Sequence, residues 1–211
     1  MSAKADTVLN TLRSLYPDAA CSLMYRNPLE LLIATILSAQ CTDIQVNKVT
    51  PALFAKYRSA EDFASAPIKE FESAIRTTGF FHNKAKNIQG ACQMIMQHFG
   101  GSVPDSMDAL VLLPGVGRKT ANVVLSNAFG INAGFVVDTH VFRISRRLAL
   151  AKGSTPEKVE QELCRTFRQS DWGDLSHLLI QFGRSICTAR NPKCGECPLK
   201  SCAGRLKSRG H

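Results

Sequence analysis

Apolar residues recur mainly at helical spacing along this chain. The segment that begins at Asn27 and Pro28 is apolar on most sides from Leu29 to Leu37. An asparagine cap followed by a proline in the first turn is a typical helix start. Because a helix that is apolar on nearly every side must be buried, we expect this one to be central to the fold.

The same period and the end signals of helices predict further helices. Two sets of apolar residues mark one helix face each: Val159, Leu163 and Phe167, and then Leu175, Leu178, Leu179, Phe182 and Ile186. Ser59 and Thr155 stand in helix-start signatures, while Gly79 and Gly100 stand where helices stop. The one strand-like run, 135–137, is too short to support a sheet. We therefore predict an all-α protein.

A glycine hairpin joins two of these helices, in the run Leu113-Pro114-Gly115-Val116-Gly117-Arg118-Lys119-Thr120-Ala121. The first helix is expected to stop at Pro114, because the residue before a proline avoids the α region. Gly115 and Gly117 can adopt conformations closed to other residues and let another backbone approach. The free amides of the turn and the positive helix end can bind a phosphate oxygen. This pattern indicates a helix-hairpin-helix that grips a nucleic-acid backbone; an ordinary helix corner is the alternative.

Lys119 would lie in the first turn of the second helix, directly after Arg118. The positive helix end and the neighbouring guanidinium both disfavour an ammonium ion, so more neutral amine is expected there. A neutral amine is what a Schiff-base nucleophile requires. A charged Lys119 that pairs with a phosphate is the alternative.

The charge of the chain points to an anionic partner. Among 211 residues, 26 Lys and Arg face 17 Asp and Glu, which gives a net charge of +9. Such a protein usually binds a polyanion or an anionic membrane. The longest apolar stretch, 31–37, is far shorter than the ~20 residues of a spanning helix, so we expect no membrane partner.

The cysteines predict a reducing compartment. The chain starts without a charged-then-apolar signal region and contains eight cysteines. We therefore expect a cytoplasmic protein without a disulfide framework. Four of the eight are expected on helices as small core residues: Cys21, Cys41, Cys92 and Cys164.

The other four cysteines, Cys187, Cys194, Cys197 and Cys202, follow the pattern C-x6-C-x2-C-x4-C. Four thiolates in one tight loop can enclose an iron–sulfur cluster or a structural zinc. Zinc usually takes two close cysteine pairs, and the six-residue gap here favours a cuboidal cluster. The loop is also rich in Lys and Arg, more than a negative cluster needs, which suggests a DNA-facing surface.

Asp138 and His140 precede a basic helical stretch. Asp138 is placed to cap that helix through its side chain. It could also accept a proton beside a nucleophile if the fold brings it to Lys119, which sequence spacing cannot decide. His140 is equally open between a structural and a functional role.

Together these features resemble the endonuclease III family, the bifunctional branch of the helix-hairpin-helix DNA glycosylases. The likeness runs from about residue 27 to residue 202 and includes three further segments: Leu37-Ser38-Ala39-Gln40-Cys41-Thr42-Asp43, Thr78-Gly79-Phe80-Phe81-His82-Asn83-Lys84-Ala85 and Ala121-Asn122-Val123-Val124. The resemblance implies two helical lobes that flank a DNA-binding cleft. One would be a six-helix barrel of residues 21–132, and the other would combine residues 1–20 and 133–211 around a [4Fe–4S] cluster.

The resemblance also implies a reaction and its residues. An oxidised pyrimidine is flipped out of duplex DNA, Lys119 displaces it through a Schiff base, and β-elimination cuts the abasic strand. Asp138 matches the family's assisting carboxylate. Gln40 matches a residue that fills the gap left by the flipped base, and His140 is expected nearby. The hairpin residues Gly115, Val116, Gly117, Arg118 and Thr120 would bind DNA, and the ligands of the cluster would be Cys187, Cys194, Cys197 and Cys202.

Two departures from the family pattern affect this interpretation. The gap between Cys197 and Cys202 is one residue shorter than usual, which could strain the cluster. Phe80 stands where the family often has a leucine that wedges into the duplex. A phenylalanine can also stack between bases, so lesion range or opposite-base preference can differ. The alternative for Phe80 and Phe81 is a place in the core.

The same motifs are compatible with several other functions. A related adenine glycosylase is disfavoured, because that family lacks a lysine at the position of Lys119. A glycosylase of different lesion range, an enzyme that acts only as an abasic-site lyase, and a non-catalytic redox-sensitive DNA-binding protein fit the same motifs. The expected partner is double-stranded DNA with damaged pyrimidines or abasic sites, bound by a monomer.

Overall fold

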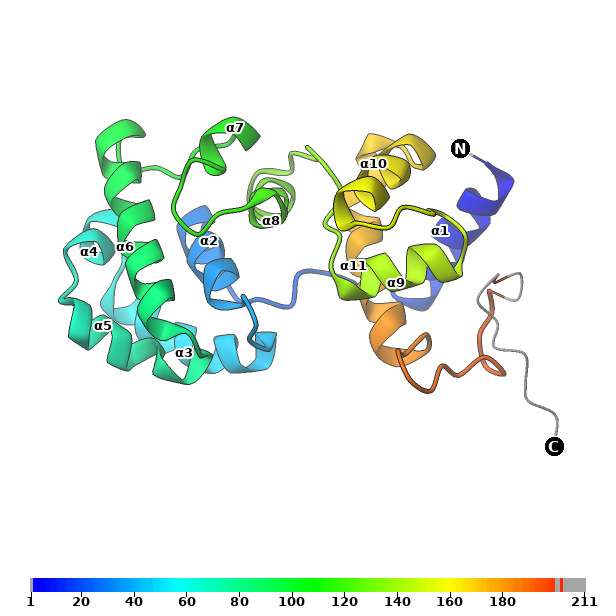
Figure 1. The fold of residues 1–211 in the computed structure, drawn as a ribbon, viewed down its shortest axis with the longest axis horizontal. Coiled ribbons are helices and arrows are strands. Elements are labelled where there is room, and N and C mark those ends of the chain that lie inside the picture. The colour runs from blue at the N-terminus through cyan, green and yellow to red at the C-terminus, as the bar shows by residue number, and fades with distance from the viewer. Residues whose placement is uncertain (1, 200–201, 203–211) are drawn as a thin grey trace. The chain divides into compact units, whose positions relative to one another are not determined.

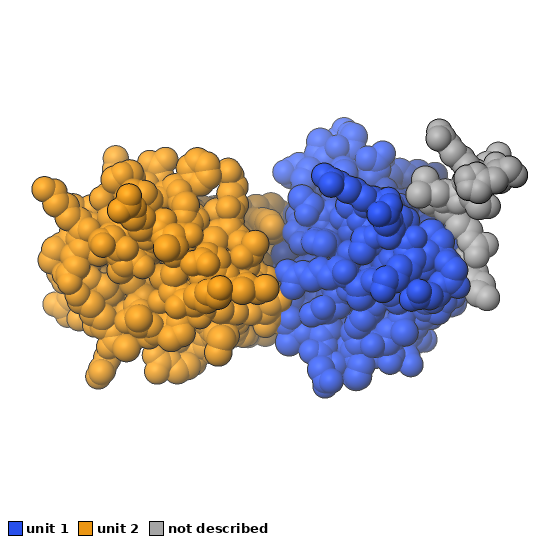
Figure 2. Space-filling model, turned by 90° about the horizontal axis from the view of Figure 1, so that it is seen from below, with its two compact units in different colours: residues 1–20, 134–211 blue, residues 21–133 orange. Residues whose placement is uncertain are grey.

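The computed structural model describes residues 2–199 and 202. Within these residues every regular element is a helix and 135–137 forms no strand, so the all-α prediction is confirmed. No described helix combines the length and the apolar character needed to cross a membrane. The chain divides into two compact units, which we call the central unit (residues 21–133) and the terminal unit (residues 1–20 with 134–211) (Figure 2).

The central unit contains seven α-helices and one short 3-10 helix: α2 (Pro28–Leu37), α3 (Asp43–Lys56), α4 (Ala60–Ser65), α5 (Ile68–Ile75), η1 (Arg76–Thr78), α6 (Phe81–His98), α7 (Met107–Leu110) and α8 (Arg118–Phe129) (Figure 1). Helix α2 packs against α3, α6 and α8. Every one of its residues from 30 to 37 is buried, so the prediction that this helix is central is confirmed for its own unit.

The start of α2 shows why the sequence forms a helix there. The side chain of Asn27 accepts a hydrogen bond from the N–H of Glu30 at 2.9 Å, and Pro28 fills the first helical position. Because Asn27 satisfies one of the unpaired donors of the first turn, the helix is fixed locally before it packs. Its apolar length then supplies the middle of the core of the central unit.

The terminal unit is assembled from both ends of the chain. Its described helices are α1 (Ala3–Leu15), α9 (Thr139–Arg147), α10 (Pro156–Thr166), η2 (Gln169–Asp171) and α11 (Trp172–Ser185). Helix α1 packs on α11. Arg13 of α1 forms ion pairs with Asp171 at 2.8 Å and with Asp174 at 2.9 Å. These contacts bring the N-terminal helix into the same apolar core as the segment that carries the four C-terminal cysteines.

Candidate functional site

The glycine hairpin lies between α7 and α8. Gly115 has a φ of +77°, in the left-handed region that favours glycine. A Cβ atom on Gly115 would lie 2.8 Å from the Cβ of Asn87 on α6, too close for any side chain. The hairpin therefore needs glycine at this position both for its backbone conformation and for its contact with α6.

Gly117 serves the hairpin differently. Its φ of −90° is open to any residue, so the conformational freedom expected of both glycines is used only at Gly115. A Cβ atom on Gly117 would meet nothing within 4 Å, and α8 begins here without a side-chain cap. The first amides of a helix have no partners within it, so an uncapped, open helix start is suited to bind an anion.

The neighbouring residues divide into anchors and exposed groups. The side chain of Val116 is 5% exposed and its N–H donates to the carbonyl of Leu113 at 3.0 Å, so Val116 holds the loop in shape. Lys119 lies in the first turn of α8 and is exposed. Leu112 is 65% exposed beside the hairpin. The hairpin thus presents a lysine amine and apolar surface around the open helix start.

Two further segments of the central unit hold exposed residues in unusual backbone conformations. Gln40 follows α2 with a φ of +53°, and Phe80 precedes α6 with a φ of +48°. Such conformations are uncommon for residues other than glycine and are often found at functional sites. Phe80 is 64% exposed, so it does not belong to the core, whereas Phe81 packs against the core.

Asp138 caps α9, as its position in the sequence predicted. Its Oδ1 accepts a hydrogen bond from the N–H of Val141 at 2.8 Å. The side chain is only partly buried, so the cap leaves room for contact with another molecule. One turn further, Arg143 Nη2 lies 3.3 Å from His140 Nδ1. Burial lowers the pKa of His140, and the charges of Arg143 and Arg184 lower it further against the opposing effect of Asp138.

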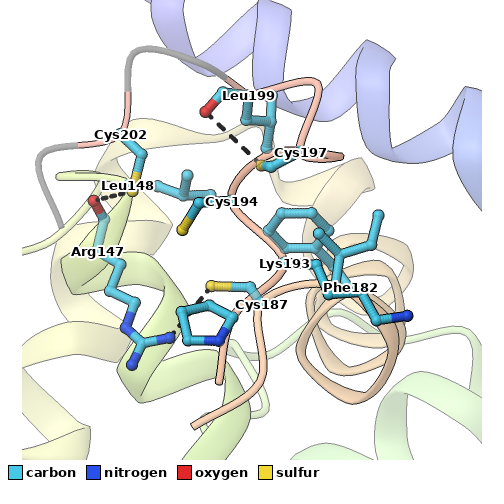
Figure 3. A pocket seen from close by; sticks show the side chains of 11 residues that line it. Arg147, Leu148, Phe182, Cys187, Lys193, Cys194, Cys197, Leu199 and Cys202 are labelled. Carbon is cyan, nitrogen blue, oxygen red and sulfur yellow. Dashed lines mark hydrogen bonds between the residues drawn. The ribbon is translucent and has the colours of Figure 1, made fainter. Parts of the chain in front are cut away.

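The four C-terminal cysteines line one pocket beyond the end of α11 (Figure 3). No carboxylate and no imidazole lies among the residues that line it. Burial raises the pKa of the Cys197 thiol, and the three other cysteines raise it further. An all-sulfur donor set around one pocket is the donor set of an iron–sulfur cluster.

Two arginines of α9 hold the first part of this loop. Arg147 Nη1 donates to the carbonyl of Thr188 at 2.7 Å and lies 3.5 Å from the sulfur of Cys187. Arg143 Nη2 donates to the carbonyl of Cys187 at 3.0 Å. The sequence indicates only the basic residues of the loop itself as charges around the cysteines, and it does not indicate Arg143 and Arg147. The only signal for them was the basic character of the stretch after Asp138.

The remaining cysteines are small packing residues, though not all lie on helices. Cys92 of α6 is buried, and burial raises the pKa of its thiol to about 12. Cys164 lies on α10, as expected. Cys21 and Cys41 lie in segments between helices, half-buried against the core, so the expectation that they are helical is wrong.

Comparisons with known proteins agree with this description. The family model of the HhH-GPD superfamily of base excision DNA repair proteins matches residues 33–169. The model of the iron–sulfur binding domain of endonuclease III matches residues 187–201, so the chain binds an iron–sulfur cluster of the [4Fe–4S] type at its C-terminal cysteines.

Similar proteins cover nearly the whole chain. Endonuclease III of Synechocystis sp. is 55% identical over 93% of this chain and 90% of its own length. Endonuclease III of Bacillus subtilis is 50% identical over 92% of this chain and 88% of its own. A solved structure of a trapped endonuclease III–DNA covalent intermediate is 46% identical, covers 97% of each chain and has a TM-score of 0.90. The chain therefore belongs to the endonuclease III family of base excision DNA repair proteins.

Proposed function

We propose that Lys119 is the nucleophile and Asp138 the assisting carboxylate of this enzyme. As a member of the endonuclease III family, the chain is a bifunctional DNA glycosylase and abasic-site lyase that removes oxidised pyrimidines. The observation that carries the residue assignment is the exposed Lys119 in the uncapped first turn of α8. Support comes from the similar protein solved as a trapped covalent intermediate with DNA.

The proposed reaction starts at the sugar of the damaged nucleotide. The neutral amine of Lys119 forms a bond to C1′ while the bond from C1′ to the base breaks, and the base leaves with that electron pair and takes up a proton. Asp138 stabilises the positive charge that develops on the sugar and assists the proton movement. The bond between C1′ and the ring oxygen O4′ then breaks, O4′ takes up the proton that the nitrogen loses, and the Schiff base forms between the nitrogen and C1′.

The second step cuts the DNA strand. The Schiff base withdraws electrons from C2′ and makes its proton acidic. Removal of this proton forms a double bond between C2′ and C3′ and expels the phosphate on the 3′ side as the leaving group. Water then hydrolyses the imine and frees Lys119.

The DNA contacts are assigned to the exposed parts of the hairpin and of two loops. The turn at Gly115 and the open helix start at Gly117, with Arg118 and Thr120, would bind a phosphate, while Val116 keeps the hairpin in shape. Gln40 would fill the gap left by the flipped base and Phe80 would stack in the duplex. His140 of the terminal unit would also contact the DNA.

The ligands of the cluster are assigned to the four cysteines of the pocket, Cys187, Cys194, Cys197 and Cys202. The cluster, when bound, would join the end of α11 to the residues that follow. Its main effect would be to stabilise the fold of this loop. The shorter gap before Cys202 does not keep this residue from the pocket, whose walls it shares with the other three cysteines (Figure 3).

The enzyme would bind DNA with two helical lobes. The two DNA-binding lobes would be residues 21–132 and residues 1–20 with 133–211, acting as a monomer on double-stranded DNA with damaged pyrimidines or abasic sites. A cytoplasmic, nucleoid-associated location would suit an enzyme that acts on DNA in bacteria, the source of the similar proteins.

Borohydride trapping tests the nucleophile. The cluster-loaded protein is incubated with a duplex that carries thymine glycol, with an abasic duplex and with an undamaged duplex. Borohydride reduces a lysine–sugar imine to a stable adduct. We expect adducts on both damaged duplexes, their complete loss in Lys119→Gln, and no loss in Lys69→Gln, which removes an exposed charge on α5.

Other results of the trapping experiment would indicate a different nucleophile or a different function. Adducts that persist in Lys119→Gln would refute the assignment of the nucleophile. Trapping on the abasic duplex alone would mean a lyase or a glycosylase for another base. Tight DNA binding without any adduct would favour the non-catalytic DNA-binding protein.

A further inference from the structure

A buried lysine of the central unit contacts two segments that are distant in the sequence. Lys84 lies in the first turn of α6 and is 4% exposed. Its Nζ donates to the carbonyl of Leu37 and to the carbonyl of Thr78, each at 2.7 Å. Burial of an ammonium group costs free energy unless the group is paired or hydrogen-bonded. These two hydrogen bonds therefore stabilise Lys84 in its buried position. Burial lowers its pKa.

Both acceptors are the last residues of helices. Leu37 ends α2 and Thr78 ends η1. The carbonyls at a helix end lack partners and carry partial negative charge, which a nearby cation stabilises. The last turn of α2 contains no basic residue of its own. Lys84 therefore supplies one positive charge to two helix ends at once.

Each of these ends leads directly into a residue of the proposed DNA interface. Gln40 follows Leu37 by three positions, and Phe80 follows Thr78 by two. Both residues are exposed and have a positive φ. A second contact joins η1 to the start of α3, the helix that follows Gln40, because Gln45 Nε2 donates to Thr77 Oγ1 at 2.8 Å. The points where the two loops leave α2 and η1 are thus fixed to each other through Lys84.

We infer that Lys84 is a positioning residue that fixes Gln40 and Phe80 relative to each other, so that both enter the duplex in one step when the damaged base leaves it. This inference rests on the proposed DNA contacts of these two residues. Lys84 is buried and therefore acts only through the two loops. Two loops that are already fixed lose less conformational freedom on binding DNA than two independent loops would.

The test compares a substrate that needs base flipping with one that does not. Lys84→Met removes the charge and both hydrogen bonds, and Lys69→Met removes an exposed lysine as the matched control. Single-turnover excision of thymine glycol from a duplex is measured beside β-elimination at an abasic site in single-stranded DNA. We expect Lys84→Met to slow duplex excision about tenfold or more, the effect of losing hydrogen bonds to a charged group. The single-strand reaction and Lys69→Met should stay near wild type.

A double-mutant cycle separates positioning from general stability. If Lys84 acts through the two loops, Lys84→Met in a Gln40→Ala/Phe80→Ala background should change duplex excision by less than about threefold. Lys84→Arg, which keeps the charge and the donors, should restore most of the wild-type rate. If Lys84→Met does not fold, Lys84→Gln takes its place in the cycle.

The inference would be overturned by losses that are equal on both substrates or additive in the cycle, because these indicate a merely structural lysine. Wild-type excision by Lys84→Met would also refute it. A failure of the proposed DNA contacts looks different, since Gln40→Ala/Phe80→Ala with Lys84 intact would then excise thymine glycol as fast as the wild type.

Discussion

Asp138 combines two roles in one carboxylate, and conservative substitution can separate them. Asparagine caps a helix about as well as aspartate, so Asp138→Asn should keep the free energy of unfolding within about 0.5 kcal/mol of wild type. It cannot accept a proton or stabilise positive charge as a carboxylate does, so single-turnover excision should fall on the order of a hundredfold. Thermal unfolding and excision of thymine glycol measure the two effects separately.

Two alanine variants serve as controls for the cap. Asp138→Ala should lose excision and also about 1 kcal/mol of stability, because the N–H of Val141 loses its acceptor. Thr155 caps α10 of the same unit by accepting from Lys158. Thr155→Ala should show a similar loss of stability and normal excision. Excision at the wild-type rate by Asp138→Asn would mean that Asp138 only caps α9 and takes no part in the reaction.

At the scale of elements, the hairpin offers a contrast between its two glycines. Gly115→Ala should destabilise the protein, because its φ of +77° is strained for alanine and its Cβ would clash with Asn87. The left-handed strain alone costs about 1–2 kcal/mol. Gly117→Ala should leave stability nearly unchanged, since its φ of −90° suits alanine and its Cβ meets open space. Thermal unfolding distinguishes the two variants.

DNA affinity should respond to Gly117 nonetheless. A methyl group at the uncapped start of α8 stands where a phosphate would approach the backbone amides. Filter binding of an abasic duplex should therefore show weaker binding by Gly117→Ala, despite its normal unfolding temperature. Unchanged affinity would mean that DNA does not approach the hairpin at this residue.

The elements that the sequence predicted well are those fixed by local contacts. Asn27, Ser59 and Thr155 each accept a hydrogen bond from an N–H three residues further along the chain. Such caps act within one turn, so the residue types alone predict them. The hairpin was predictable for the same reason, because proline restricts the backbone where it stands and glycine permits conformations closed to other residues.

Contacts between distant segments escaped sequence reasoning. Lys84 reaches the carbonyl of Leu37 across 47 residues, and Arg147 reaches that of Thr188 across 41. Neither lysine nor arginine carries a local signal that names its acceptor. The left-handed conformations of Gln40 and Phe80 were equally hidden, since neither residue is a usual choice there. The residues that hold the site in place therefore could not be predicted from the sequence. Most of the exposed residues of the site could be.

At the scale of the whole molecule, two histidines of the terminal unit make stability depend on pH. Burial lowers the pKa of His177, against the opposing effect of Asp174, and the pKa of His140 is also lowered. Below the usual histidine pKa of 6.5 the unfolded chain therefore binds protons that the folded chain does not. The contribution of these groups to stability is complete above that pH and is lost as the pH falls below it.

His177→Asn tests this dependence in the cluster-loaded protein. Between about pH 7.5 and pH 5.5 the unfolding temperature of the wild type should fall, as the unfolded state takes up protons. Asparagine does not titrate, so the fall in His177→Asn should be smaller by about 2 °C. His98 is exposed on α6, and His98→Asn should show the same fall as the wild type.

The comparison uses the change in unfolding temperature with pH within each variant, so a constant loss of stability from the substitution itself does not affect it. An equal fall in all three proteins would assign the acid sensitivity to other groups.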